Sequence, residues 1–502
     1  MRRSLWLQAA AAALALLVGL PQAAVNARQP EPRRIDLSDL RLDRLRAMAE
    51  AARTGLDYLP GEVLVRFRRG VSLAGRARAL RGIRSRPSPA ALQWMGDTAR
   101  LRDPSEPDPT ILARQLQLQP EVEWAEPVYL RRRSAIPTDP SYATLQWNFN
   151  AIGMPAAWDI QPEAGRGIVV AVVDTGVTTV DETLLLPTWN GFAAQLVPMH
   201  FAVNPDVDRA RLLPGRDFVF FSAGEPVLDF DGHGTHVAMT IAQEANNGLS
   251  GTGLAYRATL LPLKACISYW ELQIVRTAMG IPGFHPTDDQ GFCPSDAIVE
   301  AIRYAADHGA KVINLSFGGP AASQAERDAI AYAISRGATV VVAAGNSFED
   351  GNPVEYPAGF APDFAGLISV GAVGRTLGRA WYSNTGPHVE VVAPGGDTRA
   401  EAAGTGRIWQ STLAPSAMQP GFVIFPRFDR YEDVGLQGTS MATPHVSGLA
   451  AMLVAQGITR PAHVELLVTR TARDLGPAGR DVEYGAGLIQ PRAALFGLGI
   501  RR

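Results

Sequence analysis

The second half of the chain alternates between short, largely apolar runs and longer stretches with helical patterning. Apolar runs of this kind are typical of parallel strands that are buried on both faces. They occur at 168–173, 312–315 and 338–343, and the helical stretches lie at 299–308, 322–336 and 442–456. This alternation predicts an α/β fold with a doubly wound, mostly parallel sheet. Ligands of such sheets bind beyond the carboxyl ends of the strands.

A smaller region before this one is patterned differently. Residues 62–67 alternate as a strand does, residues 111–118 are patterned as a helix and residues 122–129 as a second strand. Residues 83–110 are rich in Ser, Pro and Asp, which predicts a loop. We therefore expect a small α+β domain that ends before Arg131-Arg132-Arg133.

The amino terminus has the pattern of a secretory signal peptide. Arg2 and Arg3 precede an apolar run at 5–20, and the small residues around Val25-Asn26-Ala27 offer a cleavage site. The run is 16 residues long, which is short for a membrane span. We expect a signal peptide at 1–27 and a secreted protein, extracellular or periplasmic. A retained membrane anchor is the alternative.

The net charge of the whole chain conceals a division between a basic and an acidic region. The chain has 502 residues, 46% of them hydrophobic, and a formal net charge of −2, which excludes a disordered chain and gives no sign of a nucleic-acid partner. Residues 28–136 hold 21 Arg and 14 Asp plus Glu, a formal +7, whereas residues 137–502 come to −11. Modules of opposite charge attract one another. The alternative is that the basic residues only keep their segment soluble.

The chain has two cysteines, Cys266 and Cys293, which are too few for a disulfide framework. In an exported protein they can form one bridge, which would close a loop and stabilise it by about 3 kcal/mol. Two buried free thiols are the alternative.

Three short polar motifs stand at the ends of predicted elements. Asp174-Thr175-Gly176 ends the first apolar run, and the segments from Asp231 to Ala238 and from Gly438 to His445 each open a predicted helix. Together they supply one Asp, one His and one Ser, the side chains that nucleophilic acyl transfer needs. Taken singly, the first is also the aspartic-protease signature, which needs a second such triplet that the chain lacks. The second alone is consistent with a metal-binding pair, and the third alone with a cap and turn.

These three segments, in this order, resemble the triad motifs of the subtilisin-like serine proteases. The resemblance extends over most of residues 137–495. It includes Asp217-Phe218-Val219 and the segments 312–319, 343–346, 382–386 and 484–487. It implies a serine endopeptidase with a subtilisin-like peptidase domain at 137–502.

The resemblance implies a role for each residue of the site. Asp174 orients the base, His233 is the base and Ser440 is the nucleophile, whereas His236 is structural. Asn346 corresponds to the side-chain donor of the oxyanion hole, beside the N–H group of Ser440. The substrate-binding positions are Ser316, Phe317, Gly318, Ala344 and Gly345.

Glu355, just before Tyr356-Pro357, falls at the base of the family's primary specificity pocket. A carboxylate there would favour Arg or Lys before the scissile bond through a charge-assisted contact. Because the chain offers its own run of Arg131-Arg132-Arg133, we expect self-processing after Arg133. The alternative is a solvent-facing Glu355 and a broad pocket.

The basic module resembles the family's inhibitory propeptide. The matching segments, Pro60 to Val63 and Val122 to Pro127, lie within about 58–130. The resemblance implies a propeptide at 28–136 that chaperones and inhibits the enzyme until it is cut off. The expected partners are protein or peptide substrates and this propeptide. No nucleic acid and no membrane after signal cleavage are expected, and the enzyme is expected to be a monomer.

The chain departs from the family pattern at several places. Met239 stands where a Gly usually follows the His motif. Long inserts lie at about 184–198, 266–293 and 396–437, and loops of such length around a site usually shape specificity.

Calcium is the expected cofactor. Asp139, Asp181 and Asn247 fall near positions that often bind it in the family, and their oxygen donors suit Ca²⁺. An unmetallated loop is the alternative. The alternative to an enzyme is an inactive relative that serves as a binding protein, and the intact triad motifs with Asn346 argue against it.

Overall fold

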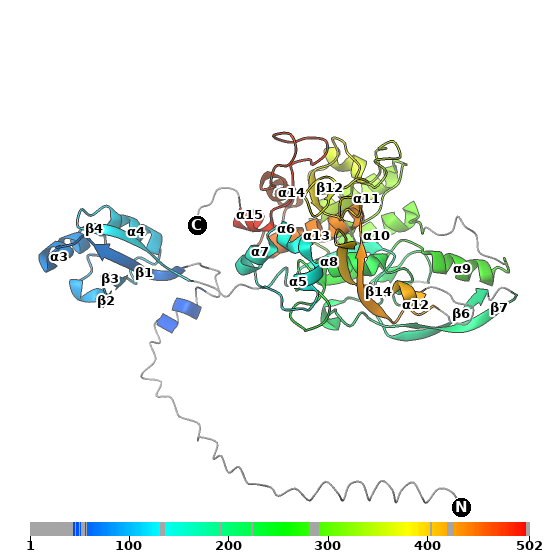
Figure 1. Ribbon diagram of the computed structural model, residues 1–502, viewed down its shortest axis with the longest axis horizontal. Helices are drawn as coiled ribbons and strands as arrows, with labels where there is room; N and C mark the ends of the chain where they lie inside the picture. Colours follow the sequence, from blue (N-terminus) through cyan, green and yellow to red (C-terminus); the bar gives the residue numbers. More distant parts are fainter. Residues whose placement is uncertain are drawn as a thin grey trace, which may run out of the picture. The chain divides into compact units, whose positions relative to one another are not determined.

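The computed structural model describes residues 58–497 apart from 131–135, 190–191, 222–223, 282–290, 402–403 and 419–425, together with several residues between 44 and 56. The predicted signal peptide and the run of three arginines at 131–133 lie outside these residues. The chain forms two compact units, Met1–Arg131 and Arg132–Arg502 (Figure 1). Among the residues described, no helix has the length and apolar character needed to cross a membrane.

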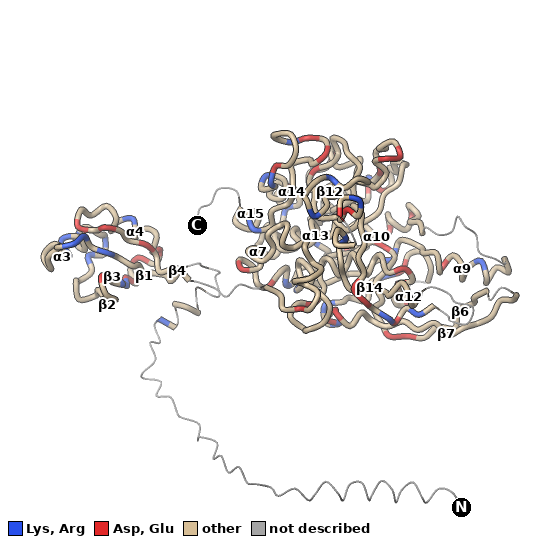
Figure 2. Tube along the Cα trace, viewed as in Figure 1, with Lys and Arg blue, Asp and Glu red and all other residues tan. Residues whose placement is uncertain are grey.

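The small unit is a four-stranded antiparallel sheet in the order β2-β3-β1-β4. Helix α4 packs against β1 and β4, and Val63, Val65, Leu101, Leu112 and Leu116 are core residues with almost no exposed surface. Basic residues gather on helix α3 (Figure 2). The predicted strands at 62–67 and 122–129 and the helix at 111–118 are confirmed. The elements are β1 (Tyr58–Phe67), α3 (Leu73–Arg81), β2 (Leu92–Met95), β3 (Thr98–Arg102), α4 (Pro109–Gln117) and β4 (Val122–Tyr129).

The prediction of a loop over 83–110 is wrong in its middle, where β2 and β3 form a hairpin. Gly96, with φ of +67°, makes the turn between them, a conformation that glycine adopts without steric cost. Ala99 and Leu101 belong to the core, whereas Arg100 is mostly covered on the other face of the strand and Arg102 is exposed. The apolar signal rests on so few residues that the surrounding Ser and Pro residues obscure it.

The large unit is built on a seven-stranded sheet in which every pairing is parallel, in the order β13-β12-β11-β10-β5-β9-β8. This confirms the predicted α/β fold with a doubly wound sheet. The strands are β5 (Val169–Asp174), β8 (Arg216–Asp217), β9 (Thr259–Lys264), β10 (Val312–Leu315), β11 (Thr339–Ala343), β12 (Leu367–Val373) and β13 (Val391–Pro394).

Helices cover both faces of this sheet, so that its side chains divide between two cores. Val170 and Val172 of β5 belong to the core that includes residues of α8 (His233–Ala242) and α13 (Thr439–Ala455). Ala171 and Val173 belong to the core that includes residues of α10 (Ser295–Asp307) and α11 (Gln324–Ser335). Successive residues of a strand point to opposite faces, which explains the unbroken apolar runs. Five further helices are α5 (Tyr142–Leu145), α6 (Trp147–Ala151), α7 (Met154–Ile160), α14 (Pro461–Arg470) and α15 (Pro491–Phe496).

The described parts of the three inserts form regular elements. In the first, at 184–198, β6 (Glu182–Trp189) pairs with β7 (Ala194–Phe201) as antiparallel strands. The second insert contains α9 (Tyr269–Ala278) and is closed by a Cys266–Cys293 disulfide, which confirms the predicted bridge. The third contains α12 (Pro415–Met418) and a ladder of β14 (Ile408–Leu413) with β15 (Tyr431–Leu436). Met239 lies fully buried in α8, within the first core.

Candidate active site

Several predicted site residues follow neighbouring strands of the large sheet. Asp174 is the last residue of β5, Ser316 follows β10, and Ala344 follows β11. Strand β10 lies between the other two, and its Leu315 is paired with residue 173 of β5 and residue 342 of β11. Because parallel strands end at one edge of a sheet, these segments lie side by side at that edge.

Asp174 and His233 form a hydrogen-bonded pair. Asp174 Oδ1 lies 2.7 Å from His233 Nδ1 and also accepts the Thr175 N–H at 2.7 Å. Asp174 is almost fully buried, whereas the His233 side chain keeps 30% of its surface exposed. This arrangement fixes the ring and leaves Nε2 as the nitrogen available to another group.

The motif analysis missed Asp229, which builds the start of the helix that carries His233. Asp229 is fully buried and accepts from Thr175 Oγ1, from the N–H groups of Asp231 and Gly232, and from the N–H and hydroxyl of Thr235. It thereby ties the loop after Asp174 to α8. An acidic residue a few positions before a predicted helix is a capping signal that could have identified it.

The charge around His233 changes the pKa of the imidazole. Burial acts to lower the pKa, but the carboxylate of Asp174, its hydrogen bond, and the carboxylates of Asp231 and Asp229 outweigh it and raise the pKa of His233 to about 9. Nearby negative charge favours the protonated ring.

Ser440 is the second residue of α13 and is linked to Ser316 by two reciprocal hydrogen bonds. The Ser440 hydroxyl donates to the carbonyl oxygen of Ser316 at 2.9 Å, and the Ser316 hydroxyl donates to the carbonyl oxygen of Ser440 at 2.9 Å. Ser316 in turn stands beside Asp174 at the sheet edge. The fold therefore brings Ser440 to the edge that holds the Asp174–His233 pair, with its hydroxyl turned toward Ser316.

Two hydrogen-bond donors converge beside Ser440. Asn346 Oδ1 accepts the N–H and the hydroxyl of Thr439, both at 2.9 Å, which orients its amide. Both donor nitrogens lie close to Gly438, because a Cβ built on this glycine would be 3.6 Å from Ser440 N and 3.7 Å from Asn346 Nδ2. Asn346 is exposed, so its amide N–H groups are open to a ligand. Such a pair of donors suits a developing oxyanion.

Glu355 lies between the two segments that carry the predicted substrate-binding residues. A Cβ built on Gly318 would lie 2.7 Å from Glu355 Oε2, and one built on Gly345 would lie 2.6 Å from Oε1. The carboxylate accepts from Asn384 Nδ2 at 3.0 Å, and within the described part of the chain it has no cationic partner. The segment is held by a pair of backbone hydrogen bonds between Gly319 and Tyr356, at 2.7 and 3.0 Å.

The sequence that builds this site matches a known protein family. The family model of the subtilases matches residues 165–487, which is more than half of the chain. The chain belongs to the subtilase family.

Individual relatives agree with this assignment. A thermophilic serine proteinase of Bacillus sp. (strain AK1) is 30% identical over 433 residues, which cover 85% of this subtilase and 86% of the relative. An extracellular protease of Xanthomonas campestris pv. campestris is 32% identical, with 76% and 61% covered. The solved structure of a protease from Pseudoalteromonas arctica PAMC 21717 is 26% identical with a TM-score of 0.53, and 72% and 99% are covered. This subtilase is therefore a subtilisin-like serine protease.

His236, the second histidine of the motif, has a structural place in the subtilase. Its Nε2 lies 3.1 Å from the carbonyl oxygens of Ile408 and Val434, on neighbouring strands of the β14–β15 ladder. Burial lowers the pKa of His236 to about 3, so the ring is neutral. It anchors α8 to the third insert.

Subtilases often bind calcium, but the three residues expected to hold it here do not fit a shared site. Asp181 forms a two-pronged ion pair with Arg209 at 2.7 and 2.8 Å. Asp139 accepts three backbone N–H groups, those of residues 246–248. Asn247 donates its side-chain amide to Asp206 at 2.7 Å. The oxygens that Ca²⁺ would need are turned to protein donors, and Arg209 places a positive charge on one of them.

Chelation is therefore expected to leave the thermal stability of this subtilase unchanged. A Ca²⁺ ion bound at these residues and present at 100 times its Kd would contribute about 2.7 kcal/mol, so its removal would lower Tm by several degrees. We expect Tm in excess EDTA to stay within about 2 °C of the value without it. A larger fall that Ca²⁺ restores and Mg²⁺ does not would contradict this expectation.

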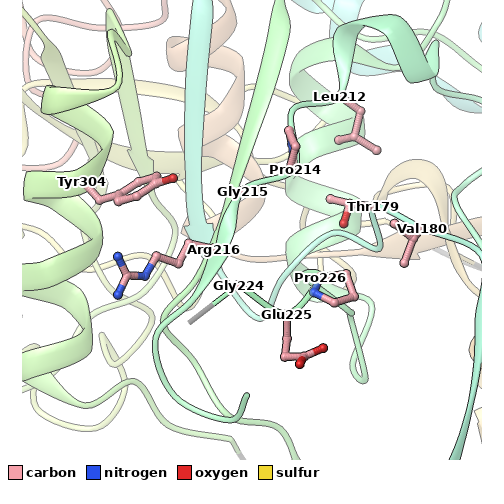
Figure 3. Close-up of a pocket in the computed structure, with 10 residues that line it drawn as sticks. All are labelled: Thr179, Val180, Leu212, Pro214, Gly215, Arg216, Gly224, Glu225, Pro226 and Tyr304. Carbon is pink, nitrogen blue, oxygen red and sulfur yellow. The ribbon is translucent and has the colours of Figure 1, made fainter. Parts of the chain in front are cut away.

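A separate pocket of about 580 Å³ opens at the edge strand β8 (Figure 3). It is lined by Arg216, Glu225 and Tyr304 together with smaller and apolar residues. The Arg216 guanidinium lies 5.6 Å from the centre of the Tyr304 ring. None of the predicted site residues lines this pocket, so it is distinct from the candidate active site.

Proposed function

We propose that this subtilase is a secreted endopeptidase that cleaves peptide bonds through an acyl-enzyme on Ser440. The observation that carries the proposal is the Asp174–His233 hydrogen bond at the sheet edge where Ser440 stands close to the Asn346 amide. Nucleophilic catalysis by serine needs a base, a group that orients the base and donors for the oxyanion.

In the proposed reaction, the Ser440 hydroxyl turns from the Ser316 carbonyl to His233 Nε2. Its proton passes to Nε2 as Oγ attacks the carbonyl carbon of the scissile bond. Asp174 holds the other ring nitrogen and stabilises the imidazolium that forms. His233 then gives the proton to the leaving amine, and a water that it activates releases the acyl group from Ser440. Catalytic hydrogen bonds that are absent before substrate binds often form with it.

Two further features support this chemistry. Ser440 N and Asn346 Nδ2 both lie close to Gly438, and we propose that together they bind the oxygen of the tetrahedral intermediate. A side-chain donor of this kind contributes about 3 kcal/mol to the transition state. We propose that Ser316, Phe317 and Gly318, which follow β10, pair with the substrate backbone. Gly345 lies against Glu355 on its other side, whereas Ala344 is fully buried.

For the primary specificity we propose Arg or Lys before the scissile bond. Glu355 supports this, because its carboxylate lies against Gly318 and Gly345 and lacks a cationic partner in the described part of the chain. A buried or half-buried carboxylate gains from an incoming cation. A broad pocket that ignores charge is the competing proposal.

For maturation we propose that the basic module is an inhibitory propeptide removed by self-cleavage after Arg133. Its +7 charge against the −11 of residues 137–502 supports an interaction between the two modules. Secretion is supported by the signal-peptide pattern and by the Xanthomonas relative, which is named an extracellular protease. The amino-terminal sequence of the secreted protein tests the cleavage site directly.

A fluorophosphonate that reacts with activated serines tests the proposed catalysis. The mature protein should be labelled once, on Ser440, and should lose its peptidase activity in proportion to labelling. A binding protein without activity would remain unlabelled, and labelling at another serine would disprove the assignment.

The activity should depend on pH through His233. The imidazole acts as a base only when it is neutral, so kcat/KM should rise with pH and reach half its maximum near the pKa of about 9. Asp231→Asn removes a carboxylate that raises this pKa, so the acidic limb should move to lower pH by roughly half to one unit. Asp328→Asn, on the exposed side of α11, is the matched control and should leave the profile in place. A profile that Asp231→Asn does not move would contradict the proposed base.

A further inference from the structure

The segment that follows β9 is hydrogen-bonded to the backbone of the proposed catalytic acid. Strands β9 and β5 end level with each other, with Lys264 opposite Asp174. The N–H groups of Ala265 and Cys266 both donate to the carbonyl oxygen of Asp174, at 2.9 and 3.1 Å. The Lys264 ammonium donates to the carbonyl oxygen of Thr175. Three donors from one short segment therefore hold the peptide units on either side of Thr175.

Glu271 balances the charge of this lysine. Its Oε1 lies 2.9 Å from Lys264 Nζ, and neither side chain has any exposed surface. Its Oε2 accepts the N–H and hydroxyl of Ser268 at 2.8 and 2.9 Å, as the capping box that begins α9. Burial acts to lower the pKa of Lys264, but Glu271, Asp217 and Asp229 outweigh it and raise the pKa, which keeps the ammonium charged.

The partner of this lysine comes from the second insert. Helix α9 and Glu271 lie within residues 266–293, which the Cys266–Cys293 disulfide closes. Lys264 is one of only two lysines in a chain that uses arginine elsewhere, the other being Lys311. An ammonium concentrates its charge and donors at one point, which suits a single backbone carbonyl better than the planar fork of arginine.

We propose that Lys264 and Glu271 are positioning residues for the reaction. The pair fixes the carbonyl of Thr175 and, with the adjacent N–H groups, the carbonyl of Asp174. It thereby sets the direction in which the Asp174 carboxylate meets His233. Through Glu271, the second insert acts on the backbone next to the proposed catalytic acid, Asp174. This inference rests on the proposed catalytic role of Asp174. A displacement of about 1 Å in such a group is enough to lower the rate by about 100-fold.

Three variants separate positioning from simple stability. Glu271→Gln leaves the ammonium buried without its counter-charge, and Lys264→Met/Glu271→Leu replaces the pair with apolar side chains. Glu244→Gln is the matched control, because Glu244 also forms a half-buried ion pair, with Arg211 and Arg257, and has no contact with Asp174. The mature enzymes are compared by Tm, kcat and KM, with the active fraction counted by fluorophosphonate labelling of Ser440.

We expect Glu271→Gln to lower both Tm and kcat, the latter by about tenfold or more, with KM changed less than twofold. The apolar double variant should regain Tm, since apolar replacement of a buried ion pair is often tolerated, but should not regain kcat. Glu244→Gln should lower Tm and leave kcat unchanged. A double variant with the wild-type kcat, or a loss confined to KM, overturns the positioning role. A wild-type enzyme without Ser440-dependent hydrolysis would instead overturn the proposed function.

Discussion

Ser440→Ala is expected to abolish peptidase activity and to leave the chain as an uncleaved precursor. Removing the nucleophile of a serine-protease triad lowers kcat by about 10⁶-fold, because the remaining groups have no oxygen to activate. The proposed self-cleavage after Arg133 depends on the same hydroxyl, so the propeptide should stay attached. Peptide hydrolysis and the size of the secreted product measure the two effects.

Ser440→Cys is the companion variant for this experiment. It retains a nucleophile of similar size at the start of α13, and it should remain reactive toward thiol reagents although its activity is low. Substitution of Ser316, whose hydroxyl donates to the Ser440 carbonyl and accepts from the Asn314 amide, should lower kcat far less. Secretion of the Ser440→Ala protein as the normally cleaved product, although the purified precursor does not cleave itself, would show that another protease performs maturation. Undiminished peptidase activity would disprove the mechanism.

Glu355→Gly is expected to remove the preference for basic residues before the scissile bond and to favour large apolar ones. A charge-assisted contact is worth about 1.5–3 kcal/mol, so kcat/KM for substrates with Arg or Lys before the scissile bond should fall by about 10- to 100-fold. Substrates with a large apolar residue at that position should gain, because the carboxylate no longer has to be desolvated beneath them. Matched peptide substrates that differ only at that position give the ratio.

Glu349→Gln serves as the control for charge in the same region. Glu349 is half exposed and paired with Arg399, so its removal changes the net charge by the same amount without opening the pocket. Its selectivity should equal that of the wild type. If the wild-type enzyme prefers large apolar residues over arginine, the specificity proposal fails while the proposed catalysis stands.

The sequence predicted the three central strands of the large sheet, β5, β10 and β11, because these strands are buried on both faces. A strand such as β5 has apolar residues at consecutive positions, and this pattern can be recognised without knowing which strands lie beside it. The hairpin of β2 and β3 shows the opposite case. Only Leu92, Ala99 and Leu101 of this hairpin belong to the core, and three such residues do not stand out among arginines, serines and prolines.

The candidate active site likewise contains residues that the sequence identified and residues that only the structure identified. The residues that we propose to carry the chemistry occur in compact motifs, so Asp174, His233 and Ser440 could be identified from their order and spacing. The residues that hold them in place could not be identified in this way. Asp229 acts through backbone groups on two segments, and the Lys264–Glu271 pair joins a strand to an insert. Such pairings depend on which segments the fold brings together.

The sequence by itself determined the fold class, the family and the side chains that we propose to react, because buried strands and short motifs are local patterns. Only the tertiary structure decided which charges meet. It turned Asp181 toward Arg209 and placed Glu355 between Gly318 and Gly345. It also placed the buried Lys264–Glu271 ion pair next to the backbone of Asp174. The physical reason is that the interaction between two charges depends on their separation and burial, and neither can be read from positions along the chain.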